Sequence, residues 1–362
     1  MKLQHIERYL CSLLHESITV TKLTPLGHDP SEIRDKAFGY GTPIRVDYET
    51  AGRKHSTAVI HTIGAGSFGH EHMADRAQIL LWQHKTFNCL PRHVRSLDVA
   101  GFAETNDAAG LISLGKVEEL CLLTEFAEGE GYFRDLENIR TSGAAGALDF
   151  ARADALCDYL AAIHRAPVDN AGLYTRRIRE LVGHGECIMG LTDSCPPHPC
   201  ITRKVLEEIE HRAVTWKWRL KDRTHRLRTV HGDFHPWNIL FQDGIEFALL
   251  DRSRGEFGDP ADDVTCLTAN YLFFSMQRSG RLEGSFNDLF LRFWDRYLEN
   301  TGDREIFDVA APYFAFRGLV MASPLWYPSL ADTVRRRLIN FILAVLDSPA
   351  FDPREVNNYC GE

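Results

Sequence analysis

The sequence predicts an α+β protein of two lobes, with an antiparallel sheet in the N-terminal lobe and mostly helices in the C-terminal lobe. Two observations support this division. Short runs of alternating apolar and polar residues lie in the first third of the chain, whereas apolar residues at helical spacing dominate after residue 147. A chain of 362 residues, of which 44% are hydrophobic, is also long enough to bury a core in each lobe.

The N-terminal lobe is expected to begin with one helix and three antiparallel strands. Leu3–Leu14 places its apolar residues on one helical face, and Ile18–Leu23 follows as a strand. Pro43–Thr50 alternates apolar and charged residues, and Thr57–Ile63 forms the next strand after the turn Ala51–Arg53. The strand Pro43–Thr50, the turn Ala51–Arg53 and the strand Thr57–Ile63 therefore predict a hairpin.

Two more strands and a helix are expected in this lobe. Leu90–Phe102 is interpreted as a loop and a strand, and Glu118–Phe126 as a buried strand. Residues 70–87 have helical spacing, and the run Gly64–Gly69 before them matches the phosphate-binding pattern G-x-G-x-x-G. No Val-Ala-x-Lys strand follows this run, so we favour a flexible connection into the helix over a direct phosphate contact.

The remainder of the chain is predicted to be helical. Helical spacing is clearest in Ala147–His164, Val205–Leu220, Asp262–Met276, Asp288–Leu298, Pro312–Met321 and Asp332–Leu346. Most aromatic residues of the last four segments are expected in the core, because packed helices need such bulk. The tail from Asp352 to Glu362 is predicted to be poorly ordered.

Polar residues in one short stretch point to phosphoryl transfer. Val230–Phe241 spells VHGDFHPWNILF, with Asp233 and Asn238 five positions apart. In a catalytic loop of this spacing an aspartate accepts a hydroxyl proton while an asparagine offers its carbonyl oxygen to magnesium. Asp251 ends a short apolar run and supplies a second oxygen ligand for the same metal.

These residues, together with the segment GEFGDPADDV at Gly255–Val264, resemble the aminoglycoside phosphotransferase and choline kinase family. The resemblance implies a protein-kinase-like fold and an ATP- and magnesium-dependent transfer of a phosphoryl group to a hydroxyl of a small molecule. It also implies a division into a nucleotide-binding lobe, residues 1–127, which ends in the hinge, and a helical lobe, residues 128–362, which carries the catalytic loop and the acceptor site.

The resemblance also implies roles for individual residues. Asp233 is similar to the catalytic base, His231 to the residue that braces the loop, and His235 takes the place of a lysine in protein kinases. Asp259 and Asp263 match a segment that holds the loop and caps the next helix. The magnesium ligands would be Asn238 and Asp251. The nucleotide would be bound by Gly39 and Gly41 in a glycine-bearing turn, by His61, and by the hinge residues Glu125, Phe126 and Ala127.

One departure from the family leaves an alternative open. The strand that should carry the phosphate-holding lysine has His61 there, and a neutral imidazole is a poor substitute for an ammonium group. Arg252 or Arg254 would supply the missing charge, unless they form surface salt bridges. The alternative function is a nucleotide-binding, pseudokinase-like regulator without transfer activity. A protein kinase is disfavoured because no Ala-Pro-Glu closes an activation segment.

Composition limits the partners and the compartment. The net charge of −9 argues against a nucleic-acid partner and is compatible with a cationic acceptor. No apolar run is long enough to span a membrane, and nine scattered cysteines agree with a reducing compartment, so we expect the cytoplasm. Cysteines and histidines between His184 and Cys200 match no standard zinc spacing, and a surface loop is favoured there over a metal site.

Overall fold

The computed structural model describes residues 3–26, 41–66, 69–70, 72–103 and 117–361, and the chain divides into two compact units. The first unit contains the described residues up to Glu128 except Gly69. The second contains Gly69 and everything described from Gly129 onward. The predicted fold class, an antiparallel sheet in one part and mostly helices in the other, is confirmed.

A five-stranded antiparallel sheet forms the centre of the first unit, in the order β1-β2-β3-β5-β4. The alternating sequence pattern produces it, because every second side chain of a strand points to the same face. On one such face Val46, Ala58 and Ile60 are buried. The strands are β1 (Ile18–Pro25), β2 (Ile44–Thr50), β3 (His55–His61), β4 (Ser96–Ala103) and β5 (Val117–Glu125).

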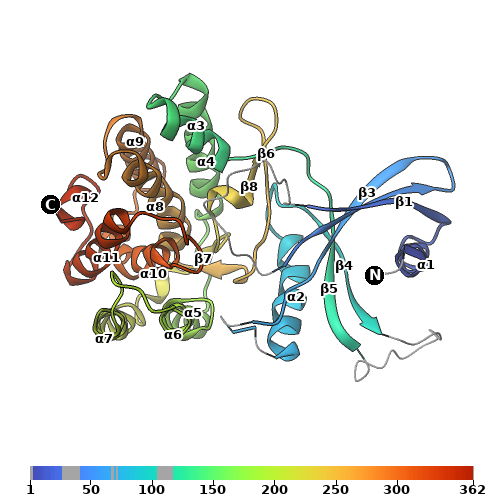
Figure 1. Ribbon diagram of the computed structural model, residues 1–362, viewed down its shortest axis with the longest axis horizontal. Coiled ribbons are helices and arrows are strands. Elements are labelled where there is room, and N and C mark those ends of the chain that lie inside the picture. The colour runs from blue at the N-terminus through green and yellow to red at the C-terminus, as the bar shows by residue number, and fades with distance from the viewer. Residues whose placement is uncertain (1–2, 27–40, 67–68, 71, 104–116, 362) are drawn as a thin grey trace. The chain divides into compact units, whose positions relative to one another are not determined.

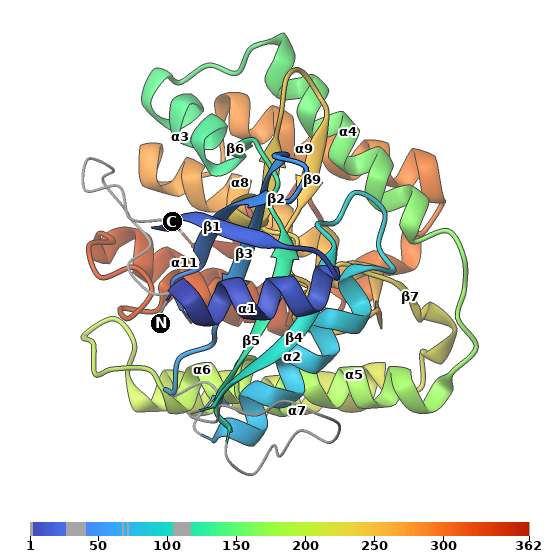
Figure 2. The same cartoon turned by 90° about the vertical axis from the view of Figure 1, so that its right-hand side faces the viewer.

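Two helices pack against this sheet. Helix α1 (Leu3–Leu14) buries Ile6 and Leu10 against the sheet, as its apolar face predicts, and Figure 2 shows it lying across the strands. Helix α2 (Met73–Phe87) packs on β4 and β5. Its Arg76 is buried and donates two hydrogen bonds to Glu119 of β5, at 2.9 and 2.7 Å.

The second unit is mostly helical (Figure 1). Its helices are α3 (Phe133–Ser142), α4 (Ala147–Ile163), α5 (Ala171–Gly183), α6 (Ile188–Asp193), α7 (Arg203–Leu220), α8 (Pro260–Ser279), α9 (Gly284–Thr301), α10 (Ala310–Ala322), α11 (Asp332–Asp347) and α12 (Val356–Tyr359). Short strands lie between them: β6 (Glu130–Gly131), β7 (Arg228–Thr229), β8 (Ile239–Phe241), β9 (Phe247–Leu249) and β10 (Phe257–Gly258). Among the described helices, none combines the length and the apolar character that crossing a bilayer requires.

Helix α8 is the central helix of this unit and contacts α3, α9 and α10. Nearly every residue from Pro260 to Met276 is buried, which is typical of a helix surrounded by other helices. The aromatic residues that the sequence assigns mostly to the core are buried, among them Tyr271, Trp294 and Phe314. That prediction is confirmed.

The prediction of a poorly ordered tail is wrong for the described residues up to Gly361. The tail forms the short helix α12, and Val356 and Cys360 are buried. The ring of Tyr359 stacks on buried Phe351, with 5.7 Å between the ring centroids. Most residues of this segment are polar, but its few buried apolar side chains pack against α11 and hold the segment in place.

Candidate active site

The predicted catalytic loop is held in place by the start of helix α8. Gly232 has a φ of 85°, a conformation that glycine adopts without steric cost, and this turns the chain sharply before Asp233. The carboxylate of Asp263 accepts the backbone N–H groups of His231 and Gly232, at 2.8 and 2.7 Å. His164 contacts the same carboxylate at 3.1 Å. The structural role expected of Asp263 is thereby confirmed.

Asp259 caps helix α8, as the Gly-Asp-Pro segment predicts. Its side chain accepts the N–H of Ala261 at 3.0 Å, and Pro260 occupies the first turn of the helix. Arg226 donates to both oxygens of Asp259, at 2.8 and 3.0 Å, and Tyr174 donates its hydroxyl at 2.9 Å. All three side chains are buried, so this network fixes where the helix starts.

His231 makes the contacts expected of a residue that braces the loop. Its ring is fully buried, Nδ1 accepts the N–H of Asp233 at 3.2 Å, and Nε2 lies 2.9 Å from the carbonyl oxygen of Leu250. This pattern requires the neutral imidazole with its proton on Nε2, because a proton on Nδ1 would meet the N–H of Asp233. Burial lowers the pKa of His231 to about 4.

We therefore expect acid to destabilise the protein partly through His231. Between pH 6.5 and about 4 the unfolded chain binds a proton here that the folded chain does not, so stability falls as the pH falls through this range. The contribution is at most about 3 kcal/mol. Denaturant titrations at pH 7, 5.5 and 4.5 should show a smaller loss for His231→Gln than for the wild type. Equal losses would contradict the assignment.

The carboxylate of Asp233 lies among two arginines, a histidine and an asparagine. Oδ1 accepts from Nη1 of Arg317 at 2.5 Å and lies 3.6 Å from Nη2 of Arg254. Oδ2 lies 3.5 Å from Nε2 of His235 and 3.3 Å from Nδ2 of Asn238. Burial alone would raise the pKa of Asp233, but Arg254, His235 and Arg317 outweigh it and hold the pKa well below its usual range. The carboxylate is therefore ionised at neutral pH.

Arg317 of helix α10 is a site residue that the sequence interpretation missed. It is buried, and besides Asp233 it binds Asp262 at 2.7 Å and the carbonyl oxygen of Gly232 at 3.0 Å. The available signal was its position as a single charge in the apolar run Ala310–Ala322. A buried charge needs a partner, so an arginine in such a run indicates a carboxylate elsewhere in the fold.

The two predicted magnesium ligands are brought together by the hairpin of β8 and β9. Ile239 pairs with Leu249, and the N–H of Leu250 bonds to the carbonyl oxygen of Asn238 at 2.9 Å, so Asp251 follows directly beside Asn238. The amide nitrogen of Asn238 donates to the backbone oxygen of Asp233 at 3.1 Å, which leaves its side-chain carbonyl oxygen as the ligand atom. Asp251 is exposed and has a φ of 51°, a strained conformation that is more frequent at functional sites.

The nucleotide-binding residues predicted in the first unit have other contacts. Gly39 lies outside the described residues, and Gly41 is explained by packing, because a Cβ there would be 2.1 Å from the carbonyl oxygen of Thr62. His61 bonds to Thr124 at 3.0 Å, and burial lowers its pKa to about 4, so it carries no charge at neutral pH.

The predicted hinge lies at the end of β5. The N–H of Glu125, the last residue of that strand, donates to the carbonyl oxygen of Arg95 at 2.8 Å. The ring of Phe126 lies under the guanidinium of Arg45, 4.5 Å from its centroid, and Ala127 follows. The nucleotide contact predicted for these hinge residues would use their backbone N–H and C=O groups.

Both arginines after Asp251 contact the catalytic loop, but only Arg254 is exposed enough to bind a ligand. Arg252 is fully buried, and its guanidinium donates to the carbonyl oxygens of Val230 and Glu256. Its role is therefore to hold the loop, and the prediction of a surface salt bridge is wrong for it. Arg254 is partly exposed, and its closest carboxylate is that of Asp233.

The segment from His184 to Cys200, where the sequence favours a surface loop over a metal site, brings together two of its cysteines and histidines, His198 and Cys200, beside Asp332. Among the described residues, the side chains close enough to share an ion are His198, Cys200 and Asp332. Nδ1 of His198 accepts the N–H of Cys200 at 3.1 Å, so Nε2 carries the proton and points at Asp332, 3.5 Å away. These contacts satisfy the imidazole without a metal.

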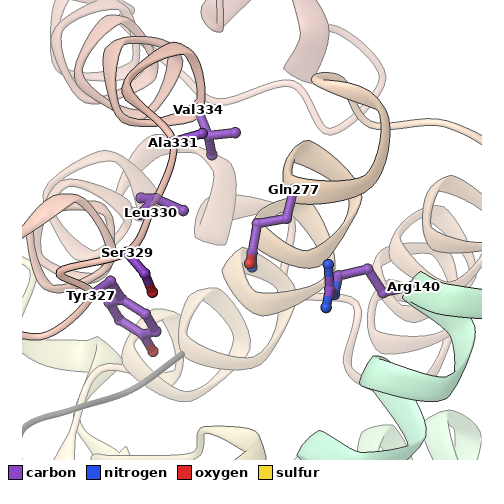
Figure 3. A pocket seen from close by; sticks show the side chains of 7 residues that line it. All are labelled: Arg140, Gln277, Tyr327, Ser329, Leu330, Ala331 and Val334. Carbon is purple, nitrogen blue, oxygen red and sulfur yellow. The ribbon is translucent and has the colours of Figure 1, made fainter. Parts of the chain in front are cut away.

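A small pocket lies far from the catalytic loop. It has a volume of about 200 Å³, and Figure 3 shows Gln277, Arg140 and Tyr327 around it together with Ser329, Leu330, Ala331 and Val334. Gln277 lies fifteen residues after Asp262 on helix α8, which is roughly 22 Å along the helix axis. This pocket is therefore separate from the groups around Asp233.

Comparisons with known proteins identify the family of the chain. The model of the phosphotransferase enzyme family matches residues 93–299, more than half of the chain. No curated protein matches the sequence. The structure resembles choline kinase LicA from Streptococcus pneumoniae in complex with AMP, with a TM-score of 0.50, 14% identity and coverage of 95% of this chain and 98% of that one.

A second similar structure is an aminoglycoside phosphotransferase from Streptomyces rimosus in complex with ADP and streptomycin. Its TM-score is 0.49 and its identity 18%, over 78% of this chain and 90% of that one. At such identities the structural likeness concerns the fold alone. The match of the family model covers the loop, both predicted metal ligands and Arg254, and on this ground the chain belongs to the phosphotransferase enzyme family.

Proposed function

We propose that the protein transfers the γ-phosphoryl group of ATP to a hydroxyl group of a small molecule, with magnesium as cofactor. The observation that carries the proposal is the joint placement of Asp233, Asn238 and Asp251 by one braced loop and one hairpin. A phosphotransferase needs a carboxylate at the acceptor hydroxyl and oxygen ligands for a metal on the phosphates. The loop and the hairpin supply both within twenty residues.

The residues present fit magnesium. An amide carbonyl oxygen and an exposed carboxylate are hard oxygen ligands, and magnesium is bound in proteins by one or two carboxylates together with substrate phosphates. Asn238 and Asp251 would hold the ion, which when bound neutralises charge on the phosphates. The ATP complexes expected here find support in the AMP complex of LicA.

In the proposed reaction Asp233 orients the acceptor hydroxyl and takes its proton. A bond forms between the acceptor oxygen and the γ-phosphorus as the bond to the β,γ-bridging oxygen breaks, and ADP leaves. Arg317 keeps Asp233 ionised and fixed, and positioning of this kind accounts for most of the expected rate. We assign nucleotide binding to residues 1–127 and the acceptor site to residues 128–362.

A regulator that binds nucleotide without transfer is the second candidate, because His61 is neutral where related kinases have a lysine. Arg76, on the helix that follows the strand of His61, already donates a hydrogen bond to Glu119 and so does not supply the positive charge that the lysine would provide. ATP consumption in the presence of magnesium and a panel of hydroxyl compounds separates the two candidates. Acceptor-dependent ADP release supports the transferase, and nucleotide binding without any release across the panel supports the regulator.

We expect magnesium to raise the melting temperature further when a non-hydrolysable ATP analogue is present, because a ligand that binds the folded state stabilises it by mass action. Asp251→Ala should lose this magnesium-dependent increment, measured by differential scanning fluorimetry. Asp243→Ala, an exposed aspartate in the turn of the same hairpin, is the matched control and should retain it. An unchanged increment in Asp251→Ala would remove Asp251 from the metal site.

A further inference from the structure

We propose that the acceptor carries an anionic group, a carboxylate or a phosphate, and that Arg254 is the residue that binds it. The proposal rests on the transferase function above and adds a substrate class to it. It differs from the cationic acceptor that the net charge of the chain alone allows. The evidence lies in the contrast between the two arginines beside Asp233.

Among the described residues, Arg317 is hydrogen-bonded to two carboxylates, whereas the distances from Arg254 to its carboxylate partners are too long for hydrogen bonds. Arg317 binds Asp233, Asp262 and Gly232 at 2.5 to 3.0 Å, distances typical of strong charge-assisted hydrogen bonds. Arg254 lies 3.2 Å from the carbonyl oxygen of Gly232, 3.6 Å from Asp233 and 3.8 Å from Glu186. Arg317 is therefore a fixed anchor of Asp233, whereas Arg254 has one backbone hydrogen bond and distant carboxylates that an anionic ligand can replace.

Arg254 is nevertheless held in one orientation. Its guanidinium lies over the ring of Phe316, 4.6 Å from the centroid, and Arg317 lies 4.4 Å from the same ring. Within the described part of the chain, the Nε atoms of Arg254 and Arg317 are both buried and lack a hydrogen-bond acceptor, so the contrast between the two arginines lies in their Nη contacts and in their exposure. Its side chain is 19% exposed, against 5% for Arg317, so it is the more accessible arginine at the base. A planar, oriented and partly exposed guanidinium suits a carboxylate or phosphate.

Each of the three carboxylates around the proposed base, Asp233, Asp262 and Glu186, already lies beside an arginine. An ammonium group of an acceptor would therefore have to compete with that arginine. Asp233 faces Arg317 and Arg254, Asp262 is bound by Arg317, and the buried Glu186 lies 3.8 Å from Arg254. To pair with one of these carboxylates, a cationic acceptor would have to displace the arginine beside it. The arginine would then keep a buried charge without its partner, which costs free energy. An anionic acceptor instead improves the partners of Arg254. It also draws positive charge away from Asp233, which strengthens that carboxylate as a base.

Sulfate is the probe that tests the anion site without turnover. With magnesium and the ATP analogue saturating, sulfate should raise the melting temperature saturably beyond the effect of sodium chloride at matched ionic strength. Arg254→Gln should lose the saturable part. Arg281→Gln, a matched change at an arginine 62% exposed, should keep it. An equal sulfate response in the wild type and Arg254→Gln overturns the inference.

Four acceptors with a common scaffold then identify the group: glycerate, glycerol 3-phosphate, glycerol and 2-amino-1,3-propanediol. We expect ADP release with one of the first two, and a KM for that compound about 10- to 100-fold higher in Arg254→Gln. Arg254→Lys keeps the charge but not the paired N–H donors of the guanidinium, so its KM should lie between those of the wild type and Arg254→Gln. This variant replaces Arg254→Gln in the test if Arg254→Gln does not fold. Release with the ammonium compound alone overturns the proposal.

The two proposals fail in different ways. Absence of any magnesium-dependent stabilisation by the ATP analogue contradicts the transferase itself. Stabilisation by the nucleotide together with a sulfate response independent of Arg254 contradicts only the anionic acceptor.

Discussion

Replacing Asp233 with asparagine should lower turnover by roughly 100- to 10,000-fold, because general-base assistance is typically worth that factor. Most of the nucleotide affinity should remain. The side chain of Asp233 contacts Arg317, Arg254, His235 and Asn238, and we assign the metal contacts to the carbonyl oxygen of Asn238 and to Asp251. Steady-state rates and calorimetric ATP titration on the same two proteins measure the two effects separately.

The control for this variant is Asp262→Asn, which removes the other carboxylate partner of Arg317 and leaves the proposed base intact. Each variant removes one of the two carboxylates that pair with the buried Arg317, so both should lose some stability. Only Asp233→Asn should lose most of its turnover. Equal losses would mean that the effect arises from releasing Arg317, and loss of ATP binding together with turnover would indicate a structural role for Asp233.

Replacing Asp259 with alanine should lower the free energy of unfolding by about 3 kcal/mol or more, because it leaves the guanidinium of Arg226 buried beside an apolar side chain. The same change removes the cap of helix α8 and the partner of the Tyr174 hydroxyl. Asp303 still binds Arg226, at 2.7 and 3.0 Å, and limits the loss. Denaturant unfolding monitored by circular dichroism gives the value.

Asp308→Ala is the matched control for this second change. Asp308 lies 3.6 Å from Arg223, and its side chain is 49% exposed. Exposed ion pairs contribute at most about 1 kcal/mol, so this variant should unfold almost like the wild type. A loss for Asp259→Ala as small as that for Asp308→Ala would show that the buried network of Arg226 adds little to stability.

Much of the fold could be predicted from the sequence, because its signals are local. The apolar face of Leu3–Leu14 predicts a helix that the structure forms at the same residues, and the alternation in Pro43–Thr50 predicts β2 to within one residue. In the second unit the apolar runs predict α4 and α7 to α11 with ends displaced by a few residues, which is usual because helix ends depend on caps. The tail could not be predicted, since the helix around Val356 depends on contacts with distant residues.

The sequence by itself determined helices α1, α2, α4 and α7 to α11 and the strands of the first unit. It also determined the spacing of Asp233, Asn238 and Asp251, because one loop and one hairpin hold all three residues. Only the tertiary structure decided what surrounds Asp233. Arg317 is 84 residues away in the chain, and nothing local relates the two until helix α10 packs against α8. It also decided that Arg252 braces the loop while Arg254 remains accessible, because burial and partner distances depend on packing and not on the order of residues.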